Sequence, residues 1–181
     1  VMKLLISYIV FTFLLFSELN AKENQSYIKN INSYEAVFTQ SIINSSGKEI
    51  LYNGKIYIKQ PSQMLWKYND PIEKFVHINN KNVTIIEPDL EQAIMSRLEK
   101  EINIIKLLKD STKVDETTYK STLYDKVYTI KIINNKLTQI KYTDELDNNI
   151  TIDFKNIKQN EPIPSDIFKF KIPYDFDIIK K

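Results

Sequence analysis

The sequence Gly-Lys-Ile-Tyr-Ile-Lys-Gln-Pro-Ser-Gln-Met-Leu-Trp-Lys-Tyr-Asn-Asp-Pro, from Gly54 to Pro71, indicates how this chain folds. Apolar and polar residues alternate on both sides of the break at Gln60-Pro61. Such alternation is typical of a β-strand with one buried face, and proline interrupts a strand because it lacks a backbone N–H. We therefore expect two adjacent strands around Pro61. Ile56, Ile58 and position 60 should share one face, since strand side chains alternate.

The same pattern recurs along most of the chain. Turns rich in Asn, Asp or Gly separate the apolar stretches, as expected for hairpins. The turn at Asn44–Gly47 and a bulge at Asn53-Gly54 belong to this prediction. The predicted strands are 34–43, 48–59, 63–69, 73–79, 82–87, 91–96, 113–120, 125–133, 136–144, 150–159 and a short one at 167–171.

Two segments have helical rather than strand periodicity. A short amphipathic helix is predicted over 24–33, and a more apolar one over 98–109. In the second, Leu98, Ile102, Ile105 and Leu108 lie on one stripe, which Ile104 and Leu107 widen.

These elements predict an α+β fold, mainly antiparallel β, in which ten or eleven strands form an open barrel with helices across its mouth. No linker or change in composition divides residues 22–181, which we take as a single domain. The first 21 residues resemble a secretory signal peptide, with Lys3 before an apolar run and Ala21 at the expected cleavage point.

Composition excludes several classes of function. The 181 residues include 25 Lys and Arg against 23 Asp and Glu, so no basic surface indicates a nucleic-acid partner. There is no cysteine, which excludes disulfides, thiol catalysis and a lipid-anchoring cysteine. With only two glycines, at positions 47 and 54, the chain has no glycine-rich phosphate loop.

Candidates for catalysis or metal binding are few. His77 is the only histidine and lies mid-strand without a nucleophile motif, so an ordinary strand residue is the better interpretation. Glu87, Asp89 and Glu91 alternate around Pro88 but lack the pattern of a calcium loop, and solvated turn residues are expected. We therefore expect no enzyme activity, no metal and no cofactor.

Several motifs resemble the periplasmic outer-membrane lipoprotein carrier family (LolA) when they are taken in order. They are Phe38-Thr39-Gln40, the run from Gly54 to Pro61, Met-Leu-Trp-Lys-Tyr with Asp70-Pro71, and Glu87-Pro-Asp-Leu-Glu-Gln92, followed by the apolar helix. The similarity is strongest between residues 34 and 110.

The resemblance implies an unclosed antiparallel half-barrel of about eleven strands, with a helical lid over an apolar cavity. Such a monomeric carrier would take the acyl chains of lipoproteins from an inner-membrane ABC transporter to the outer membrane, in some cases through a lipoprotein receptor there. The predicted cavity residues are Phe38, Ile56, Ile58, Met64, Trp66, Val76, Ile78, Ile85 and Ile94, with Ile102, Ile105 and Leu108 from the lid.

One position departs from the family pattern. The best-known members of the family have an arginine before the proline of the Gly54–Pro61 run, where it is thought to latch the lid and to take part in cargo transfer. Here Gln60 precedes Pro61, and an uncharged amide forms a weaker hydrogen bond than a guanidinium.

Two other functions fit the same half-barrel. One is a general binder of lipids or hydrophobic ligands, and the other is an envelope stress sensor. The alternation that predicts the fold does not separate a filled core from a lined cavity, so these alternatives stay open at the level of sequence.

Overall fold

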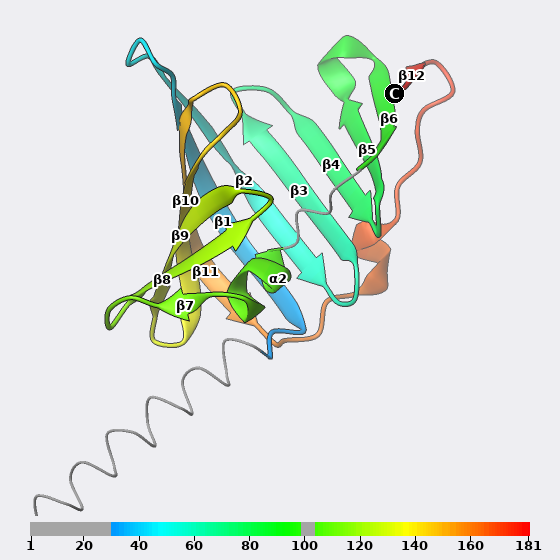
Figure 1. Ribbon diagram of the computed structural model, residues 1–181. Helices are drawn as coiled ribbons and strands as arrows, with labels where there is room; N and C mark the ends of the chain where they lie inside the picture. The colour runs from blue at the N-terminus through cyan, green and yellow to red at the C-terminus, as the bar shows by residue number, and fades with distance from the viewer. Residues whose placement is uncertain (1–29, 99–103) are drawn as a thin grey trace, which may run out of the picture.

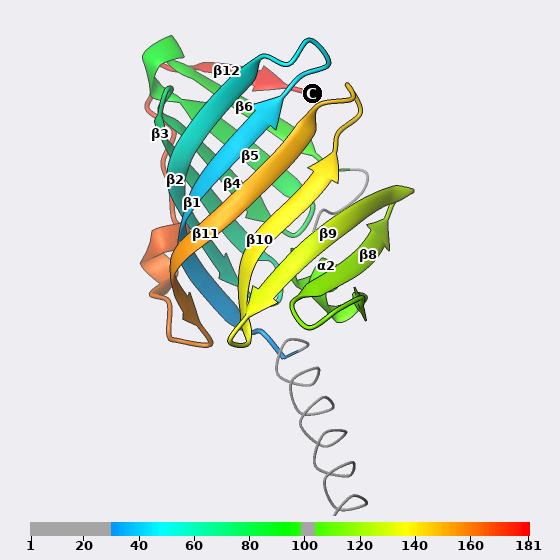
Figure 2. The same cartoon turned by 90° about the vertical axis from the view of Figure 1, so that its left-hand side faces the viewer.

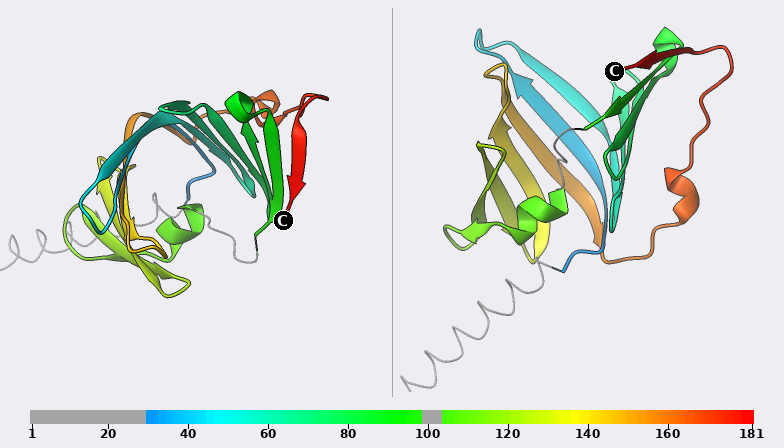
Figure 3. Two further views of the ribbon diagram at one scale, coloured as in Figure 1. Left: turned by 90° about the horizontal axis from the view of Figure 1, so that it is seen from above. Right: turned by 45° about the vertical axis from the view of Figure 1, so that its right-hand side comes forward.

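The computed structural model describes residues 30–98 and 104–181, and within them twelve strands form one sheet. The sheet bends into an arc that stays open on one side, and helix α2 (Ile104–Lys109) lies on the concave side (Figures 1 and 3). The strand order is β12-β6-β5-β4-β3-β2-β1-β11-β10-β9-β8-β7. The expected unclosed and mainly antiparallel half-barrel is confirmed, with twelve strands in place of about eleven.

The elements have the following bounds. The strands are β1 (Ser33–Ile43), β2 (Glu49–Lys59), β3 (Gln63–Asp70), β4 (Lys74–Asn79), β5 (Asn82–Glu87), β6 (Gln92–Arg97), β7 (Thr112–Lys113), β8 (Thr118–Leu123), β9 (Lys126–Ile133), β10 (Lys136–Thr143), β11 (Asn149–Gln159) and β12 (Asp177–Lys180). Besides α2 there are two 3-10 helices, η1 (Pro88–Leu90) and η2 (Ser165–Phe168).

Strand β1 is the centre of the sheet because it pairs with β2 on one side and with β11 on the other. It thereby joins the first strands of the chain to a long strand near its end, and Figure 2 shows β2, β1, β11, β10 and β9 side by side. The turn at Asn44–Gly47 closes the first hairpin, with Gly47 at a φ of 80°. The predicted bulge also occurs, as a register shift between Asn53 and Gly54 against β3.

Two predictions for the second half of the chain are wrong. The expected strand 113–120 is divided, because the carboxylate of Asp115 accepts hydrogen bonds from the backbone N–H groups of Thr117 and Thr118 and forms a turn between β7 and β8. The expected strand 167–171 does not form, because its first two residues, Ile167 and Phe168, belong to η2. Its alternating lysines and phenylalanines reflect packing of Phe170 on the outside of the sheet, where its ring lies 4.2 Å from that of His77.

The last strand is the exception to the antiparallel pairing of the sheet. β12 runs parallel to β6, with Ile178 opposite Ala93, and covers the edge that β6 would otherwise expose. Figure 1 shows the C-terminal segment passing along the outside of the sheet to reach this place.

The helical predictions are only partly covered. Of the helix expected over 98–109, the described part is α2, and residues 99–103 lie outside the described residues. Most of the helix expected over 24–33 also lies outside them, and Ser33 already belongs to β1. Among the described residues α2 is the one α-helix and it is short, so the mainly antiparallel β part of the expected fold class is confirmed and the α+β part is supported only in part. No helix in the described ranges has the length and apolar character needed to cross a membrane.

The main core lies on the concave side of the sheet, between α2 and strands β1, β2 and β8–β11. Its largest fully buried side chains are Ile31, Tyr34, Phe38, Ile56, Leu107, Leu108, Ile130 and Leu137.

Candidate functional site

The strand register aligns the predicted cavity residues into rows on the concave face. Ile56 lies opposite Trp66, and Trp66 lies opposite Val76. On the next two strands Val76 lies opposite Ile85, and Ile85 lies opposite Ile94. Directly opposed residues in a sheet point to the same side. One apolar row therefore crosses β2 to β6, and a second row contains Ile58, Met64 and Ile78.

The two ends of these rows differ in exposure. Phe38, Ile56, Ile58 and Met64 are buried, with 0 to 7% of their surface exposed. The side chains farther along, on β3 to β6, are only half-buried: Trp66, Val76, Ile78, Ile85 and Ile94. The concave face is thus filled at one end, and at the other it retains apolar surface that a ligand could cover. We call Trp66, Val76, Ile85 and Ile94 the open row.

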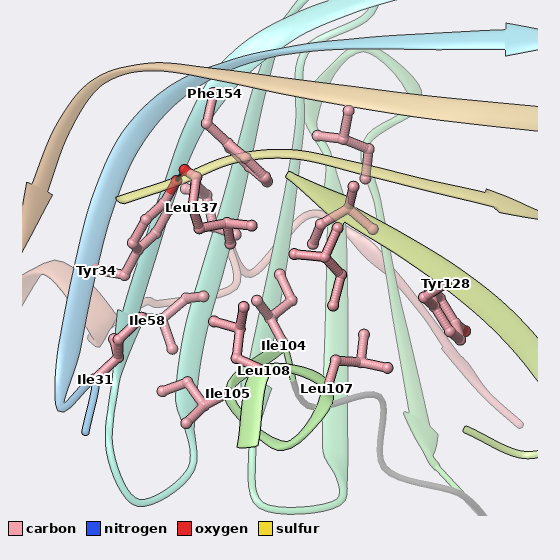
Figure 4. Packing of buried hydrophobic residues seen from close by; sticks show 14 of the residues in the cluster. Ile31, Tyr34, Ile58, Ile104, Ile105, Leu107, Leu108, Tyr128, Leu137 and Phe154 are labelled. Carbon is pink, nitrogen blue, oxygen red and sulfur yellow. Dashed lines mark hydrogen bonds between the residues drawn. The ribbon is translucent and has the colours of Figure 1, made fainter. Parts of the chain in front are cut away.

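Helix α2 fills the closed end. Ile105 and Leu108, which the sequence places on the lid, are 4% and 1% exposed, and Ile104 and Leu107 are buried as well. Figure 4 shows these four side chains among the residues of the core. Lys106 and Lys109 point outward and are exposed, so the helix presents nearly all of its apolar surface to the sheet. Ile102, the remaining predicted lid residue, lies outside the described residues.

Aromatic rings connect the closed and open ends. The ring of Phe38 makes edge contacts with Trp66 at 5.0 Å and with Tyr68 at 5.1 Å between centroids. The indole N–H of Trp66 points at the sulfur of Met64, 3.0 Å away. Edge-to-face contacts of this kind fix ring orientation, so Trp66 is held in place at the boundary of the open row.

Gln60, which the family pattern places at the latch of the lid, binds the segment around Ile31 and Asn32, within the range 24–33 where one of the two helices was expected. Its side-chain Nε2 donates to the carbonyl oxygen of Ile31 at 2.7 Å. Its backbone N–H donates to the carbonyl oxygen of Asn32 at 2.9 Å. Asn160 binds the same segment, since its side-chain oxygen accepts from the N–H of Asn32 at 2.8 Å. Pro61, beside Gln60 at the rim, is exposed.

Sequence reasoning missed the tyrosines of the concave face. Tyr52, Tyr68, Tyr128 and Tyr142 alternate in step with the apolar residues of their strands, which was the available signal. Burial raises the pKa of Tyr142 to about 12, and the nearby Tyr128 hydroxyl contributes to the shift. Burial also raises the pKa of Tyr68, with smaller contributions from Tyr142 and Tyr52. Tyr68 and Tyr142 are therefore neutral hydroxyl groups near neutral pH.

His77 lies on the opposite, convex face in the middle of β4. It is 9% exposed, and burial lowers its pKa. The C-terminal segment covers it, and a pocket of about 200 Å³ between them is lined by Thr84, Phe168 and Phe170 among others.

Glu87 accepts a hydrogen bond from Gln92. No group of three or more His, Asp or Glu residues suited to a metal ion occurs in the described part of the chain.

Comparison with known proteins agrees with this architecture. The profile of the family described as "Outer membrane lipoprotein carrier protein LolA" matches residues 29–171. The outer-membrane lipoprotein carrier protein of Campylobacter jejuni is 36% identical over 152 residues, which cover 83% of this chain and 88% of that protein. Its counterpart from Wolinella succinogenes is 35% identical over 154 residues, covering 84% and 90%.

Solved structures share the fold at low sequence identity. A LolA superfamily protein from Nitrosomonas europaea superposes with a TM-score of 0.53 and 13% identity, over 83% of this chain and 97% of that one. An uncharacterized conserved protein from Thermus thermophilus has a TM-score of 0.53 and 12% identity, over 90% and 99%. By the extent of the profile match and the identity to its relatives, the chain belongs to the LolA family of outer membrane lipoprotein carrier proteins.

Proposed function

We propose that this protein is a periplasmic carrier that shields the acyl chains of lipoproteins on their way to the outer membrane. The observation that supports this most directly is the open row, a line of half-buried apolar side chains on the concave face. A continuous line of half-buried apolar side chains is a surface against which an apolar ligand can pack. The names of the relatives supply the chemical class of the cargo.

The energetics of the task favour partial burial. Removing an acyl chain from water is worth about 0.8 kcal/mol per CH₂, so a chain of about sixteen carbons could contribute ~12 kcal/mol. A carrier that captured all of this free energy would release its cargo too slowly. Helix α2 offers a means of lowering the net gain, because its buried leucines and isoleucines occupy apolar surface that the cargo would otherwise cover.

The proposal includes the partners expected from the family. The cargo would arrive from an inner-membrane ABC transporter and leave to the outer membrane, through a lipoprotein receptor where one exists. Residues 1–21 would direct export and be removed, leaving residues 22–181 as a monomeric single domain that works without a cofactor. Its role would be that of a chaperone, with no catalytic step.

A loading experiment tests the proposal. Residues 22–181 are mixed with a triacylated lipoprotein in detergent, the detergent is removed, and the products are separated by size. A one-to-one complex that keeps the lipoprotein in solution is expected. Precipitation of the lipoprotein at every ratio would contradict the carrier role. Mass spectrometry of lipid that copurifies from cells separates the alternatives, because free phospholipid alone would favour a general lipid binder.

A further inference from the structure

Hydroxyl groups from five strands gather on the concave face, in the part of the sheet away from the turn at Gln60–Ser62. We call them the hydroxyl arc. Its members are Tyr52 on β2, Tyr68 on β3, Ser121 on β8, Tyr128 on β9 and Tyr142 on β10. Along β2 and β3, Tyr52 and Tyr68 stand at the opposite end from the buried pair Ile58 and Met64.

The arc consists of two halves, one on β2 and β3 and the other on β8 to β10. The rings of Tyr52 and Tyr68 lie 5.8 Å apart, and those of Tyr128 and Tyr142 lie 5.0 Å apart. Ser121 is directly opposite Tyr128 in the register of β8 and β9. Strands β1 and β11 separate the two halves of the arc in the sheet, and Tyr68 and Tyr142 both pack against the hydrophobic core of the concave side. Because the sheet curves, both halves face the same interior (Figure 3).

One member of the arc is a buried polar group without a partner. The Ser121 hydroxyl belongs to a side chain that is 4% exposed and has no hydrogen-bond partner among the described residues. A buried hydroxyl in this state costs free energy, which an acceptor on a ligand that reached it would recover. Tyr68, by comparison, donates to the side-chain oxygen of Gln40 at 3.1 Å.

The chemistry of these groups limits what they can bind. Alkyl chains offer no acceptor, whereas neutral hydroxyls suit an uncharged acceptor such as a carbonyl oxygen. We propose that the hydroxyl arc binds the ester carbonyl oxygens at which the acyl chains of the cargo join its glyceryl group. This inference rests on the proposed function and specifies the part of the cargo that is recognised. It orients the cargo, with the ester linkages at the arc and the acyl tails along the open row.

The test compares two probes that differ only at the linkage. One is a triacylated cysteinyl lipopeptide with ester-linked glyceryl chains, and the other carries ether-linked glyceryl chains of the same length. A hydrogen bond from a hydroxyl is typically worth about a fivefold change in affinity. Tyr142→Phe and Ser121→Ala should each weaken binding of the ester probe about fivefold and leave binding of the ether probe unchanged.

Two tyrosines serve as matched controls. Tyr57→Phe alters the convex face of β2 and should change neither probe. Tyr34→Phe removes a buried hydroxyl that already donates to the carbonyl of Leu137 at 2.8 Å, so it should lower stability without changing the preference for esters.

The outcomes separate this inference from the function on which it rests. Equal affinity of the wild-type protein for both probes would overturn the arc while leaving the carrier role intact. Failure of the wild-type protein to bind either probe would overturn both. A diester phospholipid that loses affinity in Tyr142→Phe and Ser121→Ala, when its diether analogue does not, would support the arc and extend it to glyceryl esters from free lipid.

Discussion

The ring of Phe38 on β1 lies over Gly54 on β2 so closely that residue 54 has no room for a side chain. The two residues are directly opposed in the sheet, and a Cβ at position 54 would stand 2.8 Å from two ring atoms of Phe38 and closer still to the carbonyl oxygen of Lys67. Phe38 is fully buried and touches Trp66 and Tyr68. The glycine thus positions the ring that links the core to the open row.

Gly54→Ala should therefore destabilise the fold by about 3 kcal/mol, since both the ring and the backbone of β3 must move. Urea denaturation measures the change. Gly47→Ala is the matched control: no atom lies within 4 Å of the added Cβ, so only its φ of 80° opposes the change and about 1 kcal/mol should be lost. Equal losses in the two variants would show that the Phe38 contact is unimportant.

The central strands were predictable because their alternation is local. Residues from Gly54 to Pro71 fix two strands, their faces and the bulge, and the structure agrees at each point. Long-range packing was not predictable in this way. On β3 to β6 the convex face is buried too, at Leu65, His77 and Ala93 for example, because the C-terminal segment returns over it. Nothing in the local pattern of 167–181 indicates that return.

The candidate site was predictable to a similar degree. The alternation of apolar and polar residues along each strand identified the inward residues, because successive side chains of a strand point to opposite faces. Which of them remain accessible depends on where α2 packs, and the hydrogen bond from Gln60 to Ile31 depends on a segment 29 residues away. The hydroxyl of Ser121 escaped notice because a lone serine in a strand carries no sequence signal.

The contrast between buried and open residues predicts different outcomes for the same substitution. Ile58→Glu places a charge in the filled core and should cost more than about 4 kcal/mol, so little folded protein is expected. Ile94→Glu alters a half-buried side chain in the open row and should leave the protein folded. Loading with a triacylated lipoprotein should nevertheless fall at least tenfold in Ile94→Glu, as measured by the fraction of lipoprotein kept in solution.

Met95→Glu is the matched control for this prediction, since Met95 neighbours Ile94 on β6 but points to the other face and is 38% exposed. It should load normally. If Ile94→Glu loaded as well as Met95→Glu, the open row would not be the surface that contacts the acyl chains.

Gln60 should stabilise the attachment of the N-terminal segment. Gln60→Leu removes the donor to Ile31 and should lower the free energy of unfolding by about 1 kcal/mol. Gln60→Arg keeps a donor and should retain or exceed wild-type stability. Gln60→Glu should be the least stable of the three at neutral pH, because an ionised carboxylate cannot donate to a carbonyl. Unchanged unfolding in Gln60→Leu would contradict a stabilising role for this hydrogen bond.

His77 should make the stability of the fold depend on pH near neutrality. Burial lowers its pKa in the folded protein below the ordinary value of 6.5. At a pH between the folded-state pKa and 6.5, the unfolded chain therefore binds a proton that the folded chain does not. The contribution of neutral His77 to the free energy of unfolding is complete above about pH 6.5 and is lost as the pH falls below that value. Urea denaturation between pH 7.5 and 5.5 should show this loss in the wild-type protein. The loss should be absent in His77→Gln, where only carboxyl groups titrate, at lower pH. Because the chain has a single histidine, one NMR titration gives its pKa directly, and a value at or above 6.5 would contradict the burial seen beneath Phe170.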